Sequence, residues 1–351
     1  MKHIDFTSTG EWLRDAGPDR DVVISSRVRL ARNIAGFKFS NSAEPGEQKQ
    51  IAQLTQSHLN DLSNPEQLEW YDLPGLSADE RALLLERHLI SKNLLKANHP
   101  SAVVVRHDES MSIMVNEEDH LRMQVMRSGL QLRDAYDAVN SLDNELEGQL
   151  KFAFHKRFGY LTACPTNVGT GIRISVMLHL PGLMLTNEIE RVRRAARDMQ
   201  LAIRGFYGEG SEALGDLYQI SNQTTYGKTE EELLDEFDQR VIPEVIAYER
   251  EARKLLLNKR AALLDDRVYR ALGILQSARI LKAGEAMRLL SHLRLGIEMG
   301  RLSHISTQTI HQLILLCQPA HLQRAVGRTL NQAERSIERA TLVRTRLTSP
   351  S

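Results

Sequence analysis

The chain has few of the features that mark secreted, membrane-embedded or nucleic-acid-binding proteins. Its two cysteines, Cys164 and Cys317, are too few for a disulfide framework or a structural zinc site. Lys and Arg number 45 and Asp and Glu number 45, so no net basic charge attracts nucleic acid or an anionic membrane. No apolar run approaches the roughly 20 residues of a membrane span, and the N-terminal segment lacks the apolar core of a signal peptide. We therefore expect a soluble, cytoplasmic protein with no metal cluster and no direct nucleic-acid or membrane contact.

The sequence also lacks the strand-GxxxxGK[ST]-helix unit of P-loop enzymes, and its strands and helices do not alternate regularly. Short apolar segments instead mix with helical stretches such as Ala78–Lys96. The predicted strands are Val22–Ile24, Ala102–Val105, Ser112–Val115, Ile172–Leu180 and Leu217–Ile220. This pattern predicts an α+β fold in which helices flank an antiparallel sheet.

From Pro243 onward the apolar residues recur at helical spacing. Breaks near Asp265, Lys282–Gly284, Gly300–Ser303 and Pro319 predict about five helices, which suits a compact bundle. We expect a catalytic domain over residues 1–242 and an all-α C-terminal bundle over residues 243–351.

Three polar segments are candidates for chemistry. In VVISSRVRLARN, Arg27 and Arg29 are two residues apart, so on a strand both side chains emerge from one face and suit phosphate. A solvated strand face explains an isolated pair equally well. Four polar residues from Asn116 follow an apolar segment, which normally indicates a turn. Arg204–Glu209 has glycines that let a loop close over a substrate, or that form a mobile surface loop without chemistry.

The segment Phe158–Pro181 places a lone cysteine, a glycine-flanked turn and an arginine-bearing strand in succession. Its run Cys164-Pro165-Thr166-Asn167, then Gly169-Thr170-Gly171 and Arg173, resembles the signature of the guanidino (phosphagen) kinases, the creatine and arginine kinase superfamily. The segment SSRVRLARN matches the first nucleotide motif of that superfamily, and Asn116–Arg122 is identical to its N-E-E-D-H-x-R motif. The resemblance implies phosphoryl transfer from ATP to a guanidinium nitrogen.

The resemblance also implies roles for individual residues. Glu118 and Glu209 would contact the guanidinium, and Cys164 would face it as a thiolate rather than act as a nucleophile, although a buried inert thiol is the alternative. His88 would contact the nucleotide, whereas a lone histidine is more often structural. Met177 stands where small-molecule members have a histidine, and His179 follows two residues later on the same face. With ATP and Mg²⁺ as cofactors and no protein metal ligand, the implied nucleotide-binding residues are Ser25, Ser26, Arg27, Val28, Arg29, His88, Arg122, Arg173, Ile174, Ser175, Val176, Met177, Arg204, Gly205, Phe206, Tyr207, Gly208 and Glu209.

The mechanism follows from the acceptor. A free guanidinium has a pKa above about 12 and no available lone pair, so two carboxylates are needed to orient it and assist proton removal. The arginines with Mg²⁺ would neutralise the terminal phosphoryl group and align the transfer.

Small-molecule members carry an additional helical domain ahead of the S-S-R-V-R motif, which begins here at Ser25. That departure and the C-terminal bundle resemble the bacterial protein-arginine kinases of the McsB type, which phosphorylate arginine side chains in proteins and mark those proteins for ATP-dependent proteolysis. The resemblance covers nearly the whole chain. It implies protein substrates with exposed arginine, an activator protein and a Clp-type protease complex as partners, and a homodimer formed through the bundle.

One segment departs from that branch. Its members have an R-D-x-x-R-A motif that forms a pocket for phosphoarginine, and here the residues are Arg335, Ser336, Ile337, Glu338, Arg339 and Ala340. Serine replaces aspartate, so pairing with the guanidinium part of phosphoarginine is weakened. Arg335 and Arg339 still share one helical face and suit a phosphate, although an exposed basic helix is a serious alternative.

Two other functions stay open at this point. The first is a kinase for a free guanidino compound, which would turn over free arginine or creatine. The second is a phosphoarginine-reading scaffold with an idle catalytic centre, which would need Arg335 and not Glu118 or Glu209.

Overall fold

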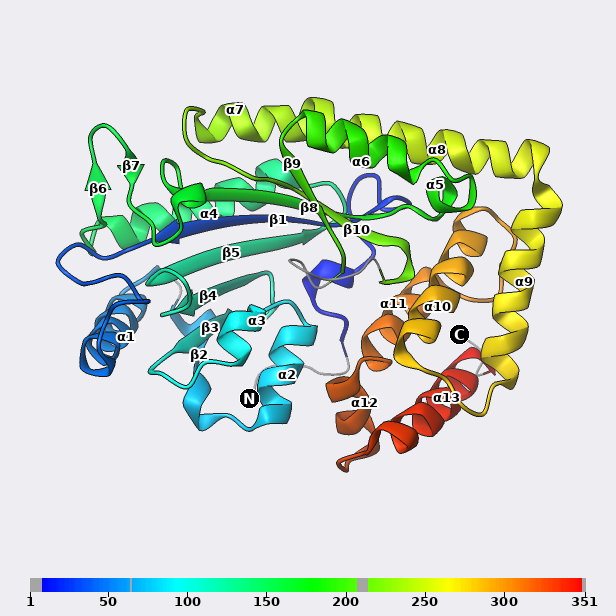
Figure 1. Ribbon diagram of the computed structural model, residues 1–351. Helices are drawn as coiled ribbons and strands as arrows, with labels where there is room; N and C mark the ends of the chain where they lie inside the picture. The colour runs from blue at the N-terminus through cyan, green and yellow to red at the C-terminus, as the bar shows by residue number, and fades with distance from the viewer. Residues whose placement is uncertain (1–7, 64, 207–213, 349–351) are drawn as a thin grey trace.

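The computed structural model describes residues 8–63, 65–206 and 214–348, and its centre is one eight-stranded sheet (Figure 1). The strand order is β2-β3-β4-β5-β1-β8-β10-β9, and all neighbouring strands are antiparallel, which confirms the α+β prediction. A separate hairpin, β6–β7, projects at one end of the sheet (Figure 1). The strands are β1 Val23–Arg32, β2 Leu68–Asp72, β3 Ala102–Arg106, β4 Met111–Val115, β5 Leu121–Ser128, β6 Phe154–His155, β7 Gly159–Tyr160, β8 Ile172–His179, β9 Leu201–Arg204 and β10 Leu217–Asn222.

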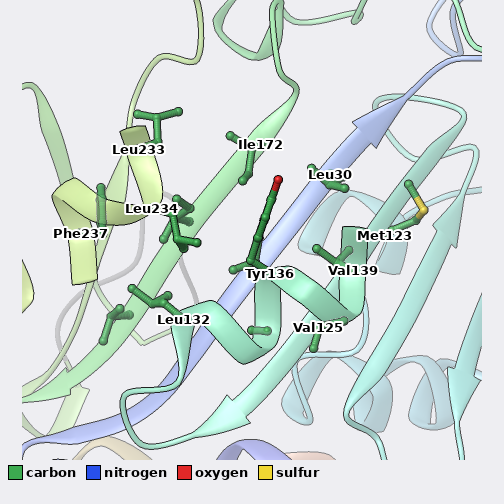
Figure 2. Packing of buried hydrophobic residues seen from close by; sticks show 14 of the residues in the cluster. Leu30, Met123, Val125, Leu132, Tyr136, Val139, Ile172, Leu233, Leu234 and Phe237 are labelled. Atoms are coloured by element: carbon green, nitrogen blue, oxygen red, sulfur yellow. The ribbon is translucent and has the colours of Figure 1, made fainter. Parts of the chain in front are cut away.

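One face of the sheet supplies an apolar core. Leu30, Met123 and Val125 from the central strands pack against Tyr136 and Val139 of helix α4 (Leu132–Glu147), as Figure 2 shows. Leu233, Leu234 and Phe237 from the helical segment above β8 close the same layer. This face is covered by helices, so the polar residues that alternate with its side chains must lie on the other face.

The predicted helix Ala78–Lys96 is wrong as a single element. Helix α2 (Ala78–Glu86) ends before His88, whose backbone has a φ of 60°, and the short helix α3 (Lys92–Leu95) begins after Ser91 accepts a hydrogen bond from the Leu94 amide. A left-handed residue cannot continue a right-handed helix. The chain therefore turns at His88. The other helices of this part are α1 Pro45–Leu59, α5 Pro181–Leu185 and α6 Ile189–Asp198.

The helical region begins earlier than Pro243. Helix α7 (Glu230–Asp235) continues through a π-helical segment, Glu236–Val241, into α8 (Ile242–Lys259), with Pro243 in the first turn of α8. Proline cannot donate a backbone hydrogen bond, and a π turn just before it lets the helix continue.

Five further helices follow α8, so the part from Ile242 onward has six helices rather than about five. The additional break lies after α12, where Gly327 ends the helix in the left-handed conformation with a φ of 78°. The five helices are α9 Ala261–Ser277, α10 Ala283–Glu298, α11 Thr307–Leu316, α12 Pro319–Val326 and α13 Gln332–Thr348. Across the described ranges, no helix is both long enough and apolar enough to span a bilayer.

Helix α8 is fixed to the catalytic part by a buried carboxylate. Glu249 accepts hydrogen bonds from the amides of Gly182 (2.9 Å) and Leu183 (3.0 Å) at the start of α5, and Arg253 donates to it at 2.7 Å. A side chain on Gly182 would meet Glu249, since a Cβ there would lie 2.9 Å from Oε1. The contact therefore requires glycine at position 182 and an acidic residue at position 249.

We expect Glu249→Ala to lower the free energy of unfolding by about 3 kcal/mol, because it leaves two amides and the buried Arg253 without their acceptor. The matched control is Glu251→Ala, two residues along the same helix at an exposed position. Thermal melting of both variants measures the difference. Equal melting temperatures would show that the buried carboxylate does not hold α8 in place.

Candidate functional site

A cavity of about 750 Å³ opens on the polar face of the sheet. It lies between the central strands and the segment that turns at His88. Its lining residues are strongly charged, and they include the five predicted arginines, His88, Glu118 and Cys164. They are Arg27, Arg29, Leu85, His88, Ile90, Ser91, Lys92, Asn93, Glu117, Glu118, Arg122, Cys164, Thr166, Asn167, Arg173, Arg204, Gln219 and Gln223.

Strand register brings five arginines to one face of the sheet. Arg29 on β1 is directly opposite Arg173 on β8, and Ala31, two residues further along, is opposite Arg122 on β5. Gln219 on β10 is opposite Arg204 on β9. Residues that pair directly across antiparallel strands share a face, as do residues two apart on one strand. The prediction that Arg27 and Arg29 share a face is confirmed.

The five arginines repel one another. Burial and, after it, the neighbouring charges of Arg173, Arg122 and Arg204 lower the pKa of Arg27 to about 10. Within the described ranges, the hydrogen-bond partners of Arg27 are the neutral side chains of Ser175 (3.2 Å) and Gln219 (3.1 Å). The pKa of Arg29 is also lowered, by burial and by the charges of Arg27, Arg122 and Arg173, and its Nε has no hydrogen-bond partner in the described residues. A cation cluster of this kind is stabilised by a bound polyanion, so the residues fit a polyphosphate.

Two glutamates in the turn between β4 and β5 offset part of this charge in different ways. Glu117 is buried, pairs with Arg122 at 2.6 Å and accepts a hydrogen bond from Ser91 at 2.6 Å. Burial alone would raise its pKa, but Arg122, Ser91, the Glu118 amide and Arg29 together lower it. Glu118 is about one-third exposed, pairs with Arg122 at 2.9 Å and has a raised pKa, because burial and the charges of Glu117 and Asp119 outweigh Arg122. Glu117 is therefore a fixed counter-charge, while Glu118 is the carboxylate suited to accept a proton.

Buried hydrogen bonds hold this turn in place. Asn116 has a φ of 55° and donates to the carbonyl oxygens of Gln48 (2.7 Å) and Pro100 (2.9 Å). Asp119 accepts from Asn33 and from the amide of Ala163, both at 2.7 Å. The second bond ties the Glu118 turn to the segment that carries Cys164, so the two approach the cavity as one unit. Neither Glu117 nor Asp119 was singled out from the sequence.

Cys164 lies on the cavity wall, with its Sγ 3.1 Å from the hydroxyl oxygen of Thr166. The glycine turn that follows supports this wall. Gly171 has a φ of 68°, and a Cβ there would lie 2.6 Å from the carbonyl oxygen of Ala31. Arg32 holds the turn by donating to the Thr170 carbonyl at 2.8 Å. The glycines therefore set the backbone path into Arg173, and Arg32 is structural.

The opposite end of the cavity is aromatic, with Arg27 as its charged neighbour. His88 packs against Trp12, with ring centroids 4.5 Å apart, and against Phe206 at 5.2 Å. Burial, with a contribution from Arg27, lowers the pKa of His88 to about 3, so the ring is neutral near pH 7. A small adjoining cavity of about 20 Å³ is lined by Trp12, Ser25, Arg27, His88, Met126, Ser175, Met177 and Gln219. A flat, uncharged base fits this end. No sequence motif indicated that Trp12 contributes to the site.

Trp12 is placed by the C-terminal helices. The carbonyl oxygen of Leu13 lies 3.0 Å from Nδ1 of His311 on α11, and Arg294 of α10 donates to the other nitrogen of that ring at 3.1 Å. His179, by contrast, is buried away from the cavity and accepts from Arg294 at 2.7 Å. It is joined to the bundle rather than exposed beside Met177.

Some predicted residues face elsewhere or lie outside the described residues. Val28, Ile174 and Val176 are in the apolar core, and Ser26 donates to the carbonyl of Gly129 at 2.8 Å on that side. Their side chains do not line the cavity. Gly205 directly follows Arg204 at the end of β9, whereas Tyr207, Gly208 and Glu209 fall outside the described residues.

The six residues of the predicted phosphoarginine pocket share helix α13, but their polar groups have internal partners. Arg339 is buried and donates to the carbonyl oxygens of Cys317 (2.7 Å) and Leu281 (3.0 Å). Arg335 donates to the Leu330 carbonyl, and Ser336 to that of Gln332, both at 3.0 Å. Glu338 pairs with Arg328 at 3.3 Å, Ile337 is half exposed and Ala340 is buried.

Comparisons with known proteins agree with this geometry. Residues 50–252 match the family model of the ATP:guanido phosphotransferase C-terminal catalytic domain, and residues 261–351 match that of the protein-arginine kinase McsB C-terminal domain. The chain is 44% identical to a protein-arginine kinase of Halalkalibacterium halodurans over 96% of this chain and 94% of that protein. It is 45% identical to a protein-arginine kinase of Symbiobacterium thermophilum over 96% of each chain.

Solved structures share the fold. A lombricine kinase aligns with a TM-score of 0.59 and 25% identity, over 68% of this chain and 69% of that one. A duplicated taurocyamine kinase from Schistosoma mansoni aligns with a TM-score of 0.61 and 23% identity, over 81% of this chain and 41% of that one.

The cavity geometry predicts polyphosphate binding that depends on Arg29. We expect Arg29→Gln to weaken the binding of inorganic tripolyphosphate about thirtyfold, the equivalent of one charge-assisted hydrogen bond of about 2 kcal/mol. Arg127→Gln is the matched control, because Arg127 is on β5 but pairs with Ser26 on the opposite face and with Asp134 at 2.6 Å. Isothermal titration calorimetry measures both. Equal losses in the two variants would mean that the anion does not bind on the arginine face.

Proposed function

This chain belongs to the ATP:guanido phosphotransferase family and to its protein-arginine kinases, and on that basis we propose that it transfers the terminal phosphoryl group of ATP to arginine side chains of proteins. The observation that carries the proposal is the composition of the cavity: five arginines line it together with Cys164 and Glu118, a carboxylate suited to accept a proton that pairs with Arg122. One cavity therefore offers groups for an anionic donor and for a cationic acceptor.

The residues divide the reaction between them. Arg27, Arg29, Arg122, Arg173 and Arg204 would hold the phosphates in line with the acceptor, and the aromatic end at His88 and Trp12 would take the base. Glu118 would orient the guanidinium and take the proton that leaves its nitrogen as the new P–N bond forms and the bond to ADP breaks. Glu209 stays the predicted second carboxylate. Mg²⁺ bound with the nucleotide would neutralise phosphate charge.

The relatives favour a protein acceptor over a free guanidino compound. The protein-arginine kinases match both halves of the chain at about 44% identity, whereas the lombricine and taurocyamine kinases share the fold at 23–25% identity. The idle scaffold has less support, because Arg335 and Arg339 are used for contacts within the bundle.

Several finer expectations stay predictions. They are the marking of phosphorylated proteins for a Clp-type protease, an activator protein, a homodimer formed through the bundle, and phosphoarginine binding at Arg335–Ala340. The division at residue 242 is a further proposal. The family models meet between residues 252 and 261, and α8 packs against α5 of the catalytic part.

The product provides the first test. With MgATP and an unfolded arginine-containing protein, we expect phosphoarginine by mass spectrometry and much slower turnover of free arginine. Glu118→Gln should lower the rate on the order of 10²-fold or more, because it removes the proton acceptor while keeping the shape of the side chain. Glu251→Gln on the surface of α8 is the control. Faster turnover of free arginine than of protein would favour the small-molecule alternative.

The pH dependence provides the second test. Glu118 acts as a base only when it is deprotonated, so its raised pKa places the acidic limb of the kcat/KM profile above the ordinary glutamate value of 4.5. Glu117→Gln removes a negative neighbour that raises the pKa of Glu118 and leaves Arg122 to pair with Glu118 alone. Both changes lower that pKa, so we expect the acidic limb to move to lower pH. Asp108→Asn, an exposed change in the turn between β3 and β4, should leave the limb in place; a limb that Glu117→Gln leaves unmoved or raises would contradict the role of Glu118.

A further inference from the structure

Exposed large apolar side chains are few in the described residues, and three of the six are connected to one loop of the cavity wall. The six are Phe154, Phe158, Tyr226, Tyr269, Ile280 and Ile337. The first three belong to two segments that are hydrogen-bonded to the loop Cys164–Gly169, and we call these three residues the aromatic rim. Monomeric proteins rarely gather exposed aromatic side chains without a binding partner.

The β6–β7 hairpin carries Phe154 and Phe158 and is fixed to that loop. Tyr160 on β7 donates from its amide to the Gly169 carbonyl at 2.8 Å and accepts from the Gly169 amide at 3.3 Å. A Cβ on Gly159 would lie 2.4 Å from the Gly169 carbonyl oxygen, so the strand and the loop are in direct contact. The Phe154 ring packs edge-on against that of Tyr160, with centroids 5.3 Å apart. Phe154 is nevertheless 58% exposed.

Tyr226 belongs to a second segment attached to the same loop. The hydroxyl of Thr225 donates to the carbonyl oxygens of Val168 (2.8 Å) and Thr166 (3.4 Å). The Tyr226 side chain is 59% exposed. Cys164, Thr166 and Asn167 of this loop line the cavity, so the aromatic rim borders the side of the cavity where Cys164 and Glu118 lie.

The hairpin also has a charge of one sign. Residues 151–163 contain Lys151, Lys156 and Arg157 and no acidic residue, and all three cations are exposed. The hairpin projects from the body of the molecule, as Figure 1 shows. Its surface is therefore complementary to a ligand with apolar and acidic groups.

We propose that the aromatic rim binds the polypeptide segment that flanks the acceptor arginine, and that it favours an apolar residue and an acidic residue near that arginine. This inference rests on the proposed function, because it is the protein acceptor that brings a main chain to the mouth of the cavity. When an arginine of an extended segment points into the cavity, the residues two positions away share its face and meet the surrounding surface. Phe154, Phe158 and Tyr226 supply apolar contact there, and the hairpin cations attract acidic neighbours. A free arginine has no flanking residues and gains nothing from this surface.

The test compares two peptides on the full chain. The first has phenylalanine two positions from a single arginine and glutamate next to it, and the second has serine and glycine at these positions. We expect the wild type to use the first peptide with a kcat/KM about tenfold higher, the size of a partly buried aromatic contact. Phe154→Ala combined with Phe158→Ala should remove the part of this preference that comes from phenylalanine and so lower the kcat/KM of the first peptide severalfold, with the second peptide and the KM for ATP unchanged.

Tyr269→Ala is the matched control, because Tyr269 is 53% exposed but lies on α9 of the bundle. Binding of the same peptides with citrulline in place of arginine, followed by fluorescence anisotropy, reports docking without chemistry. If citrulline peptides are discriminated but no arginine peptide is phosphorylated, the proposed function fails and the docking surface stands. Equal use of the two peptides by the wild type would overturn the docking surface. Unchanged discrimination between the two peptides by the double variant would also overturn it. The same holds if light scattering shows that the only effect of the double variant is a change of oligomeric state.

Discussion

Mutual repulsion among five guanidinium groups on one face of the sheet is the constraint on which the rest of the structure depends. Register alone places Arg122, Arg29 and Arg173 side by side on three adjacent strands, so the sheet cannot separate them without changing its pairing. The stabilisation must therefore come from elsewhere. It comes from the apolar opposite face, packed against α4 and the α7 region, and from Glu117, which is held as a buried counter-charge under the cavity. A site prepared for an anion is thus supported by a core that takes no part in the chemistry.

The C-terminal helices are joined to the catalytic part by carboxylates placed at helix starts. Glu249 of α8 accepts the first amides of α5, and Glu86 at the end of α2 accepts those of Ala320 (2.8 Å) and His321 (3.0 Å) in α12. Helix N-termini favour negative charge, so each contact satisfies both partners. The Glu86 contact lies two residues before His88 in the chain. The bundle therefore contacts the segment that places His88 at the aromatic end of the cavity.

The sequence pattern predicted those features of the structure that depend on residues close together in the chain. Two arginines two apart on a strand, glycines where the backbone is left-handed and helical spacing after Pro243 each have a short-range physical cause, and the structure has all three. Strand β5 was not predicted, because Arg122 and Gln124 interrupt its apolar residues. Only the folded sheet shows that Arg122 lines the cavity and that Gln124 donates to the His88 carbonyl at 2.7 Å. The helix predicted across His88 failed because tertiary contacts of residues 86 and 87 fix a turn there. Only the family resemblance separates Glu117 from Glu118; the local pattern does not, since their different burial arises from Ser91 and Arg122 in three dimensions.

The contact of Leu13 with His311 joins residues 298 positions apart. Trp12, next to Leu13, lines the small cavity beside His88, so the wall there depends on a helix that is synthesised much later than Trp12 itself. Protein domains generally fold as they are synthesised, from the N-terminus onward. In this chain the sheet and its arginines are complete long before α11 emerges, whereas Trp12 has no partner from α11 until then. The order of synthesis thus allows the arginine-lined side of the cavity to form before the contact that supports Trp12 can be made.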